Sequence, residues 1–174
     1  MRVTWGVAAA ITAFACLALA GCYNELDWRE VRSEQGRYRI TLPAKPLEQT
    51  RTLNSAAGAV TMTMVSAQAA DWLFGVGYAD YPAGVDAERH IDEQRDALLR
   101  NISGRISSEK AVRIGGKTGR LLTAEGRSGD RLVALHARFV VDGPRLYQIA
   151  AVGSKGGVSA TELDTFLDSF KLQN

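Results

Sequence analysis

The side chains that could act as acids, bases or metal ligands are few in this sequence. His90 and His136 are its two histidines. A zinc-type site would need both of them close in space together with a third ligand, and no spacing along the chain supports that. A nucleophilic serine would sit in a Gly-x-Ser-x-Gly turn, which does not occur. We therefore predict a protein that is not an enzyme and uses no metal or cofactor, with His90 on the solvated face of a helix and His136 on a strand face.

The segment Gly116-Lys117-Thr118 has the composition of the end of a phosphate-binding loop. The first glycine of that motif would have to stand at position 111, where the chain has Ala111. The segment also joins two predicted strands, whereas a phosphate-binding loop is followed by a helix. We interpret its glycines as hairpin-turn residues and expect no nucleotide site.

Cys16 and Cys22 are the only cysteines, and both belong to the apolar start of the chain. Arg2 is followed by an uncharged stretch over residues 3–20, and small residues precede Cys22, which is the layout of a secretory signal peptide. A transmembrane helix is the alternative, because about eighteen apolar residues nearly span a bilayer. It is less favoured, because no basic residue flanks the segment directly after Cys22.

The residues Leu19-Ala20-Gly21-Cys22 resemble the lipobox of bacterial lipoproteins. The resemblance implies cleavage between Gly21 and Cys22 and attachment of lipid to Cys22, so that acyl chains anchor the mature protein to a membrane without spanning it. Tyr23 stands where lipoproteins retained in the inner membrane of enteric-type bacteria usually have Asp. An outer-membrane location facing the periplasm is therefore favoured. With Cys16 removed and Cys22 lipidated, no disulfide is expected within one mature chain.

We expect three parts: a signal peptide over residues 1–21, a lipidated tether over 22–27, and one α+β domain over 28–174. Removal of the first part leaves 174 − 21 = 153 residues, which is the size of one domain. Arg2 is the only charged residue removed, so 20 basic and 19 acidic side chains remain, a net charge of +1. This balance gives no reason to expect nucleic-acid binding.

Alternation of apolar and polar residues predicts a mainly antiparallel sheet of hairpins and a meander, packed by two helices. The strand at residues 72–81 has aromatic side chains on one face and small ones, including two glycines, on the other, which is typical of a central strand with something packed closely against it. The predicted strands are 37–42, 50–54, 60–65, 72–81, 105–114, 117–125, 131–141 and 145–152; the predicted helices are 87–102, capped by Asp86, and a segment that begins with a capping box at Ser159.

This order of elements is similar to that of the PsbP-like group of α/β/α sandwich domains. The resemblance implies an α+β sandwich in which the C-terminal helix completes the core, and it implies a role in binding other proteins rather than in catalysis. No binding motif of the group can be carried over to individual residues. The features that carry the resemblance are Trp28, the strand that ends in Pro43 with Pro46 beyond it, the turn at residues 115–120, the pairs Arg138-Phe139 and Leu146-Tyr147, and the ending Phe166-Leu167-Asp168-Ser169-Phe170.

Basic residues are frequent in the meander, where residues 105–145 contain nine basic and four acidic side chains. Arginines that point the same way would meet anionic lipid, cell-wall carboxylates or an acidic protein. Strand alternation, however, divides such residues between the two faces. The candidate binding surface consists of Arg113, Arg120, Arg131 and Arg138.

Two functions remain open from the sequence. The first is a lipid-anchored envelope protein that acts as a non-catalytic adaptor and holds a protein partner. The alternative is a periplasmic carrier of a small ligand, with an apolar pocket between a helix and the face that carries Trp72, Phe74 and Tyr78. Bulky aromatic residues at strand spacing are more often core residues than pocket linings, so the adaptor is favoured.

Overall fold

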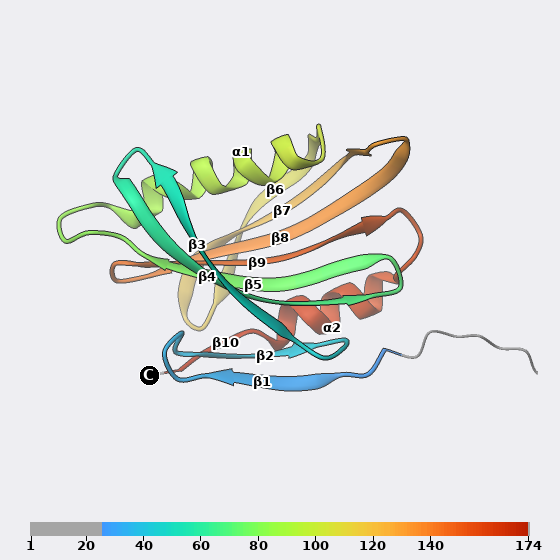
Figure 1. Ribbon diagram of the computed structural model, residues 1–174, viewed down its shortest axis with the longest axis horizontal. Helices are drawn as coiled ribbons and strands as arrows, with labels where there is room; N and C mark the ends of the chain where they lie inside the picture. Colours follow the sequence, from blue (N-terminus) through green and yellow to red (C-terminus); the bar gives the residue numbers. More distant parts are fainter. Residues whose placement is uncertain (1–25, 174) are drawn as a thin grey trace, which may run out of the picture.

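The computed structural model describes residues 26–173, which form two antiparallel sheets and two helices (Figure 1). The predicted signal peptide and the predicted lipidation and cleavage residues, Gly21 and Cys22, lie outside the described residues. Among residues 26–173, no helix combines the length and the apolar composition needed to cross a membrane.

The larger sheet has seven strands in the order β3-β4-β5-β9-β8-β7-β6, and every neighbouring pair is antiparallel. The predicted hairpin and the predicted four-stranded meander are both present. They are joined by pairing of β5 with β9, in which Trp72 lies opposite Gly153. The strands are β3 (Leu47–Ser55), β4 (Gly58–Ala69), β5 (Trp72–Asp80), β6 (Arg105–Ile114), β7 (Lys117–Ser128), β8 (Arg131–Asp142) and β9 (Arg145–Ser154).

The smaller sheet joins the beginning and the end of the described chain. Its strands, in the order β1-β2-β10, are β1 (Arg29–Ser33), β2 (Tyr38–Leu42) and β10 (Lys171–Leu172). The sequence predicts β2 but neither β1 as a separate strand nor β10, because a two-residue strand is too short to show alternation.

Two α-helices follow the predicted positions. A 3₁₀ turn, η1 (Ala87–His90), leads into α1 (Ile91–Asn101), and the Asp86 carboxylate caps the turn by accepting from Glu88 N at 3.0 Å. The helix α2 (Ala160–Ser169) begins with the predicted capping box, in which Ser159 and Glu162 exchange hydrogen bonds.

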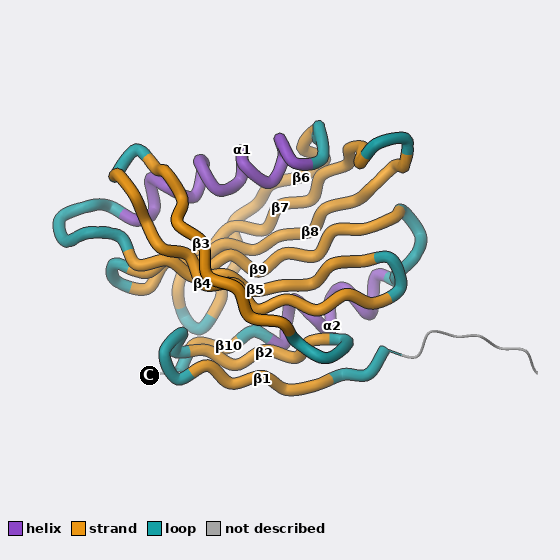
Figure 2. The backbone as a smooth tube through the Cα atoms, viewed as in Figure 1, coloured by secondary structure: helices purple, strands orange, loops and turns teal. Residues whose placement is uncertain are grey.

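The two faces of the larger sheet bury two separate hydrophobic clusters, which gives the predicted layered α+β architecture. On one face the aromatic side of β5 packs on α2 and on the smaller sheet: the rings of Phe74 and Phe166 are 5.2 Å apart, edge to face. On the other face α1 crosses the sheet, with Ile91 and Ile102 buried beneath it. Figure 2 shows α1 and α2 as separate helices on either side of the larger sheet.

Candidate functional site

A cleft of about 690 Å³ lies between α1 and the β3–β4 hairpin, above the middle of β5 and β9. We call it the α1 cleft. In Figure 1 the hairpin rises from the lower part of the sheet to the first turn of α1, so that the helix and the hairpin stand as two walls. Small-molecule sites in proteins have volumes of about 300–1,000 Å³, so the α1 cleft is large enough to hold a ligand.

The cleft is deep over the middle of the sheet because β5 and β9 carry small residues there. Gly75 lies opposite Ala150, and Gly77 lies opposite Gln148. A Cβ atom on Gly77 would come within 2.5 Å of the Met62 Cε, so the thioether side chain lies directly over the glycine. Since methionine is flexible, this part of the floor can deform around a bound group.

The walls of the cleft combine apolar and polar side chains. Ala97 and Leu98 of α1 face Leu53 of β3 and Met64 of β4 across the opening. Leu73, at the start of β5, lines one end and is 46% exposed. An apolar chain lying along β5 would therefore contact side chains on three sides.

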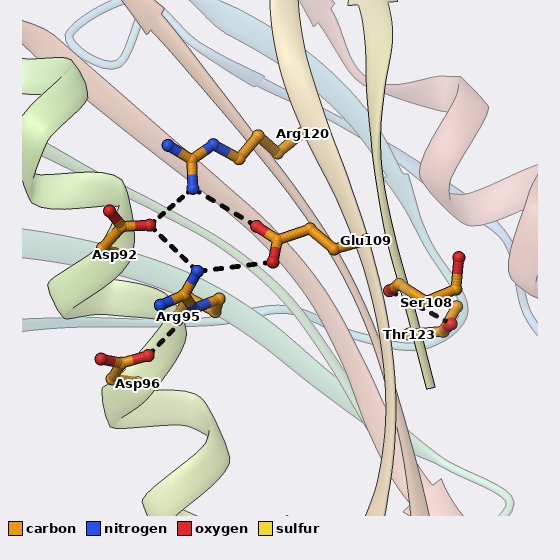
Figure 3. Close-up of polar contacts among 7 residues, drawn as sticks. All are labelled: Asp92, Arg95, Asp96, Ser108, Glu109, Arg120 and Thr123. Atoms are coloured by element: carbon orange, nitrogen blue, oxygen red, sulfur yellow. Dashed lines mark hydrogen bonds and ion pairs between the residues drawn. The ribbon is translucent and has the colours of Figure 1, made fainter. Parts of the chain in front are cut away.

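The helix is held away from the hairpin by ion pairs on its other side (Figure 3). Arg120 of β7 contacts Asp92 of α1 at 2.5 Å and Glu109 of β6 at 3.3 Å, and Arg95 of α1 contacts Glu109 at 3.4 Å. Arg95 also pairs with Asp92 and Asp96 on its own helix. The hydrogen bond that Arg120 donates to Asp92 raises the pKa of the Arg120 guanidinium. We call Asp92, Arg95, Asp96, Glu109 and Arg120 the α1 ion cluster.

Both ends of α1 are also attached to the sheet. At its C-terminal end, Arg127 N donates to Ile102 O at 2.6 Å. Only glycine fits at the neighbouring position 126, because a Cβ atom there would lie 2.2 Å from the same carbonyl oxygen. At its N-terminal end, Ala56 N at the tip of the hairpin donates to Glu93 Oε1 at 3.3 Å. The cleft is therefore the space that remains where α1 bridges the sheet between these attachments.

His90 helps to form the N-terminal attachment, and the prediction that it is solvated is wrong. The side chain is buried, its ring stacks on Tyr81 with 4.3 Å between centroids, and its Nδ1 lies 2.9 Å from Glu93 Oε2. The 3₁₀ turn before α1 rotates this position inward from the face expected for a continuous helix.

One polar side chain of β9 lies at the floor of the cleft. Gln148 is 6% exposed and lines the cleft, and it is not among the fully buried polar groups that lack a partner within the described chain, which are Tyr38 Oη, Tyr81 Oη and Arg138 Nε. Its amide offers both hydrogen-bond donors and an acceptor. The position suits a hydrogen bond to a molecule in the cleft.

The unpaired charges at the rim are positive. Within the described chain, Arg51 of β3 and Arg100 of α1 line the cleft and make no ion pair. The acidic groups at the cleft are already engaged, Glu93 with His90 and Asp96 with Arg95. The rim is therefore complementary to an anion.

The four arginines of the predicted binding surface do not lie together. Arg120 belongs to the α1 ion cluster, whereas Arg138 is on the other face of the sheet, where it donates to Leu167 O at 2.9 Å and pairs with Asp168 at 2.6 Å. Arg113 holds the β6–β7 turn by donating to Gly116 O, and Arg131 begins β8 at the opposite end of the sheet. Two of the four thus fasten the helices, one to each face.

The pocket predicted over Trp72, Phe74 and Tyr78 is in the wrong place. These side chains are buried in the cluster formed with α2 and β2, and Trp72 Nε1 donates to Ser154 O at 3.0 Å. The cleft lies on the opposite face of the same strand. The sequence feature that marks the α1 cleft is the pair Gly75 and Gly77, which from the sequence alone indicates a site of close packing.

Within residues 26–173, no group of three His, Cys, Asp or Glu side chains is arranged to hold a metal ion. His136 lies on the face of α2, 6.1 Å from the Trp72 ring, as its strand position predicts. Burial lowers the pKa of His136 below its ordinary value of 6.5.

No family model matches the sequence, and no curated protein is significantly similar to it. Among solved structures, cyanobacterial PsbP (CyanoP) from Synechocystis has a TM-score of 0.57 at 13% identity, over 90% of this chain and 98% of that one. A protein from Bacteroides thetaiotaomicron has a TM-score of 0.52 at 13% identity over 84% of this chain, which spans 48% of that longer chain. A Pseudomonas aeruginosa protein of unknown function scores only 0.43. The predicted PsbP-like fold is confirmed, and at these identities the likeness concerns the fold alone.

Proposed function

We propose that the protein is a lipid-anchored, non-catalytic binding module of the bacterial envelope, and that it holds a single-chain anionic amphiphile, such as a long-chain fatty acid, in the α1 cleft. The observation that carries the proposal is the cleft itself, a space of about 690 Å³ that is lined by apolar and polar side chains and has the amide of Gln148 at its floor. Pockets of this size with a few convergent polar groups are typical ligand sites.

The ligand class follows from the lining. The small residues Gly75 and Ala150 leave room for a chain along β5, and Leu98 and Met64 supply apolar walls. Burying a methylene group against such walls contributes about 0.8 kcal/mol. Arg51 and Arg100 at the rim favour a carboxylate head group, because a guanidinium binds carboxylate through two parallel hydrogen bonds.

The envelope location rests on the lipobox resemblance at Cys22 and stays a prediction, as does the existence of a protein partner. An adaptor role remains the second candidate, since the apolar floor and the rim of the cleft would equally accept a segment of a partner protein. The two candidates differ in what fills the cleft: a free amphiphile in the first, an apolar peptide segment in the second.

The test uses residues 22–174 with Cys22→Ser, because both hydrophobic clusters are complete within residues 26–173. We expect this protein to bind the fluorescent apolar probe N-phenyl-1-naphthylamine saturably and palmitate to displace it. Ala150→Trp, which fills the floor, and Ala97→Trp, which fills the helix wall, should each abolish the signal. Ala160→Trp, at the exposed first residue of α2 on the other face of the sheet, is the matched control and should bind as the unchanged protein does.

The head-group prediction has its own control. Arg51→Gln with Arg100→Gln should weaken palmitate displacement at least tenfold and leave hexadecanol displacement unchanged. Lys110→Gln with Lys171→Gln changes the net charge equally at exposed positions outside the cleft lining. This variant should leave displacement by palmitate and by hexadecanol unchanged. Absence of saturable probe binding, or full binding by a cleft-filled variant that retains its circular dichroism spectrum, would refute the proposed function.

A further inference from the structure

Four large apolar side chains are strongly exposed on the described surface, and all four stand at the beginning of a strand. Leu47 is the first residue of β3, and Leu73, Ile106 and Leu132 are the second residues of β5, β6 and β8. Their exposed fractions are 58%, 46%, 44% and 59%.

The topology brings these four strand starts to one end of the molecule. The sheet order β3-β4-β5-β9-β8-β7-β6 is antiparallel throughout, so β3, β5, β8 and β6 all run in the same direction. The beginnings of β5 and β8 can be followed at the right of the sheet in Figure 1. Leu47, Leu73 and Ile106 lie on the α1 face of the sheet and Leu132 on the α2 face, so that this end carries apolar side chains on both faces. We call it the strand-start end.

The described chain also begins at this end. The β1–β2 turn is attached at the far end, where Arg145 donates to Gln35 O at 2.6 Å and Tyr147 donates to Gly36 O at 2.8 Å. Arg145 and Tyr147 start β9, opposite the last residues of β5. Since β1 runs from Arg29 toward that turn, its first residue lies at the strand-start end.

This position matters because Cys22, the predicted lipid attachment, is only four residues before Leu26, the first described residue. Four residues reach at most about 14 Å when fully extended. A lipid on Cys22 would therefore keep the strand-start end within reach of the head groups of a bilayer.

The polar neighbours of the apolar residues suit a phospholipid surface. Arg105 and Arg131 directly precede Ile106 and Leu132, both are exposed, and neither makes an ion pair within the described chain. Of the carboxylates at this end, Glu125 is paired with Lys155 at 2.8 Å, whereas the exposed Asp71 and Asp130, directly before β5 and β8, make no ion pair within the described chain. A guanidinium binds a phosphate bidentately, which is the contact offered by every phospholipid head group.

We propose that the strand-start end is a membrane-contact surface, in which the four apolar side chains enter the head-group region of a phospholipid bilayer and Arg105 and Arg131 bind its phosphates. Amphipathic surfaces bind membranes in this way when apolar residues lie beside basic ones. The surface acts in addition to the lipid anchor and does not depend on a ligand in the α1 cleft.

The experiment measures cosedimentation of residues 22–174, Cys22→Ser, with vesicles of phosphatidylethanolamine and phosphatidylglycerol at 3:1. We expect binding without the lipid anchor, and at least fivefold less binding for Ile106→Ser with Leu132→Ser, two positions outside the cleft lining. Arg105→Gln with Arg131→Gln should also weaken binding. Lys110→Gln with Lys171→Gln is the matched control, since it removes two exposed charges that make no ion pair within the described chain and lie away from the strand starts.

Four outcomes would overturn the proposal. They are no vesicle binding by the unchanged protein, full binding by the Ile106–Leu132 variant, equal losses for the arginine variant and the lysine control, and an Ile106–Leu132 variant that keeps vesicle binding but loses self-association in analytical ultracentrifugation. The result is separable from the proposed function. Ala150→Trp should bind vesicles normally, and the Ile106–Leu132 variant should still bind palmitate.

Discussion

Gln148 occupies a position where an apolar side chain would be easier to accommodate. It lies in β9 between β5 and β8, opposite Gly77 and Phe139, and its neighbours on the cleft face are Leu146 and Ala150. Gln148 is the polar one of the three β9 residues that line the cleft, so its amide can recognise a polar group of a ligand.

We therefore predict that Gln148→Leu impairs binding. Displacement of N-phenyl-1-naphthylamine by palmitate should weaken in this variant, because a leucine side chain of similar volume offers no hydrogen bond. Urea denaturation checks that the variant is folded. Unchanged displacement by palmitate in a folded Gln148→Leu variant would contradict this role of the amide.

At the scale of elements, α1 determines the width of the cleft. The helix is attached at both ends and along the side that faces β6 and β7, whereas the side that faces β3 and β4 is free apart from the hydrogen bond between Ala56 and Glu93. Glu109 is the one member of the α1 ion cluster that contacts both arginines from the sheet side, and its side chain is 26% exposed. It therefore couples β6 to the helix and to β7 at once.

Glu109→Gln should loosen α1 without unfolding the domain. Partly exposed ion pairs contribute about 0.5–1 kcal/mol, and salt screens them. We expect amides of residues 91–101 to exchange faster with deuterium in low salt, and the difference from the unchanged protein to shrink in 1 M salt. Glu125→Gln breaks the exposed pair with Lys155 and is the control. Unaltered exchange across α1 would show that the end attachments alone hold the helix.

At the scale of the whole molecule, Arg145 joins the two sheets. Its guanidinium binds both carboxylate oxygens of Asp80 at 2.6 Å, donates to Gln35 O in the β1–β2 turn, and lies 4.6 Å from the centre of the Tyr78 ring. Because the side chain starts in the larger sheet and ends at a turn of the smaller one, it couples the folding of the two.

Arg145→Ala should lower the free energy of unfolding by about 2 kcal/mol at pH 7, since several charge-assisted hydrogen bonds are lost. The hydrogen bond from Arg145 lowers the pKa of Asp80 below its ordinary value of 3.8. A carboxylate with a depressed pKa stabilises the fold above its unfolded pKa and loses that contribution as the pH falls through its folded pKa. The difference between Arg145→Ala and the unchanged protein should therefore narrow below pH 3.8, and a constant difference in urea denaturation from pH 7 to pH 2.5 would contradict this account.

The two proposed surfaces meet at one residue. Leu73 lines the open end of the α1 cleft and belongs to the strand-start end. A cleft that opens toward the membrane would let an amphiphile pass between the bilayer and the protein without crossing water. The membrane contact and the ligand site would then act as parts of one arrangement.

The elements of this protein were predictable from its sequence because their signals are local. Alternation in residues 38–42 and 131–141, the cap at Asp86 and the capping box at Ser159 each depend on neighbours within a few positions, and the structure has the corresponding strands and helices. The glycines of β5 were recognised for the same reason.

The tertiary structure alone decided what those elements enclose. Pairing of β5 with β9 and the addition of β10 beside β2 depend on contacts between distant segments, which periodicity does not encode. Periodicity assigned residues to faces, but only the position of α1 decided that the face of Gly75 and Gly77 stays open while the aromatic face is filled. The separation of Arg120 from Arg138, and the burial of His90, follow from the same packing of helices on opposite faces.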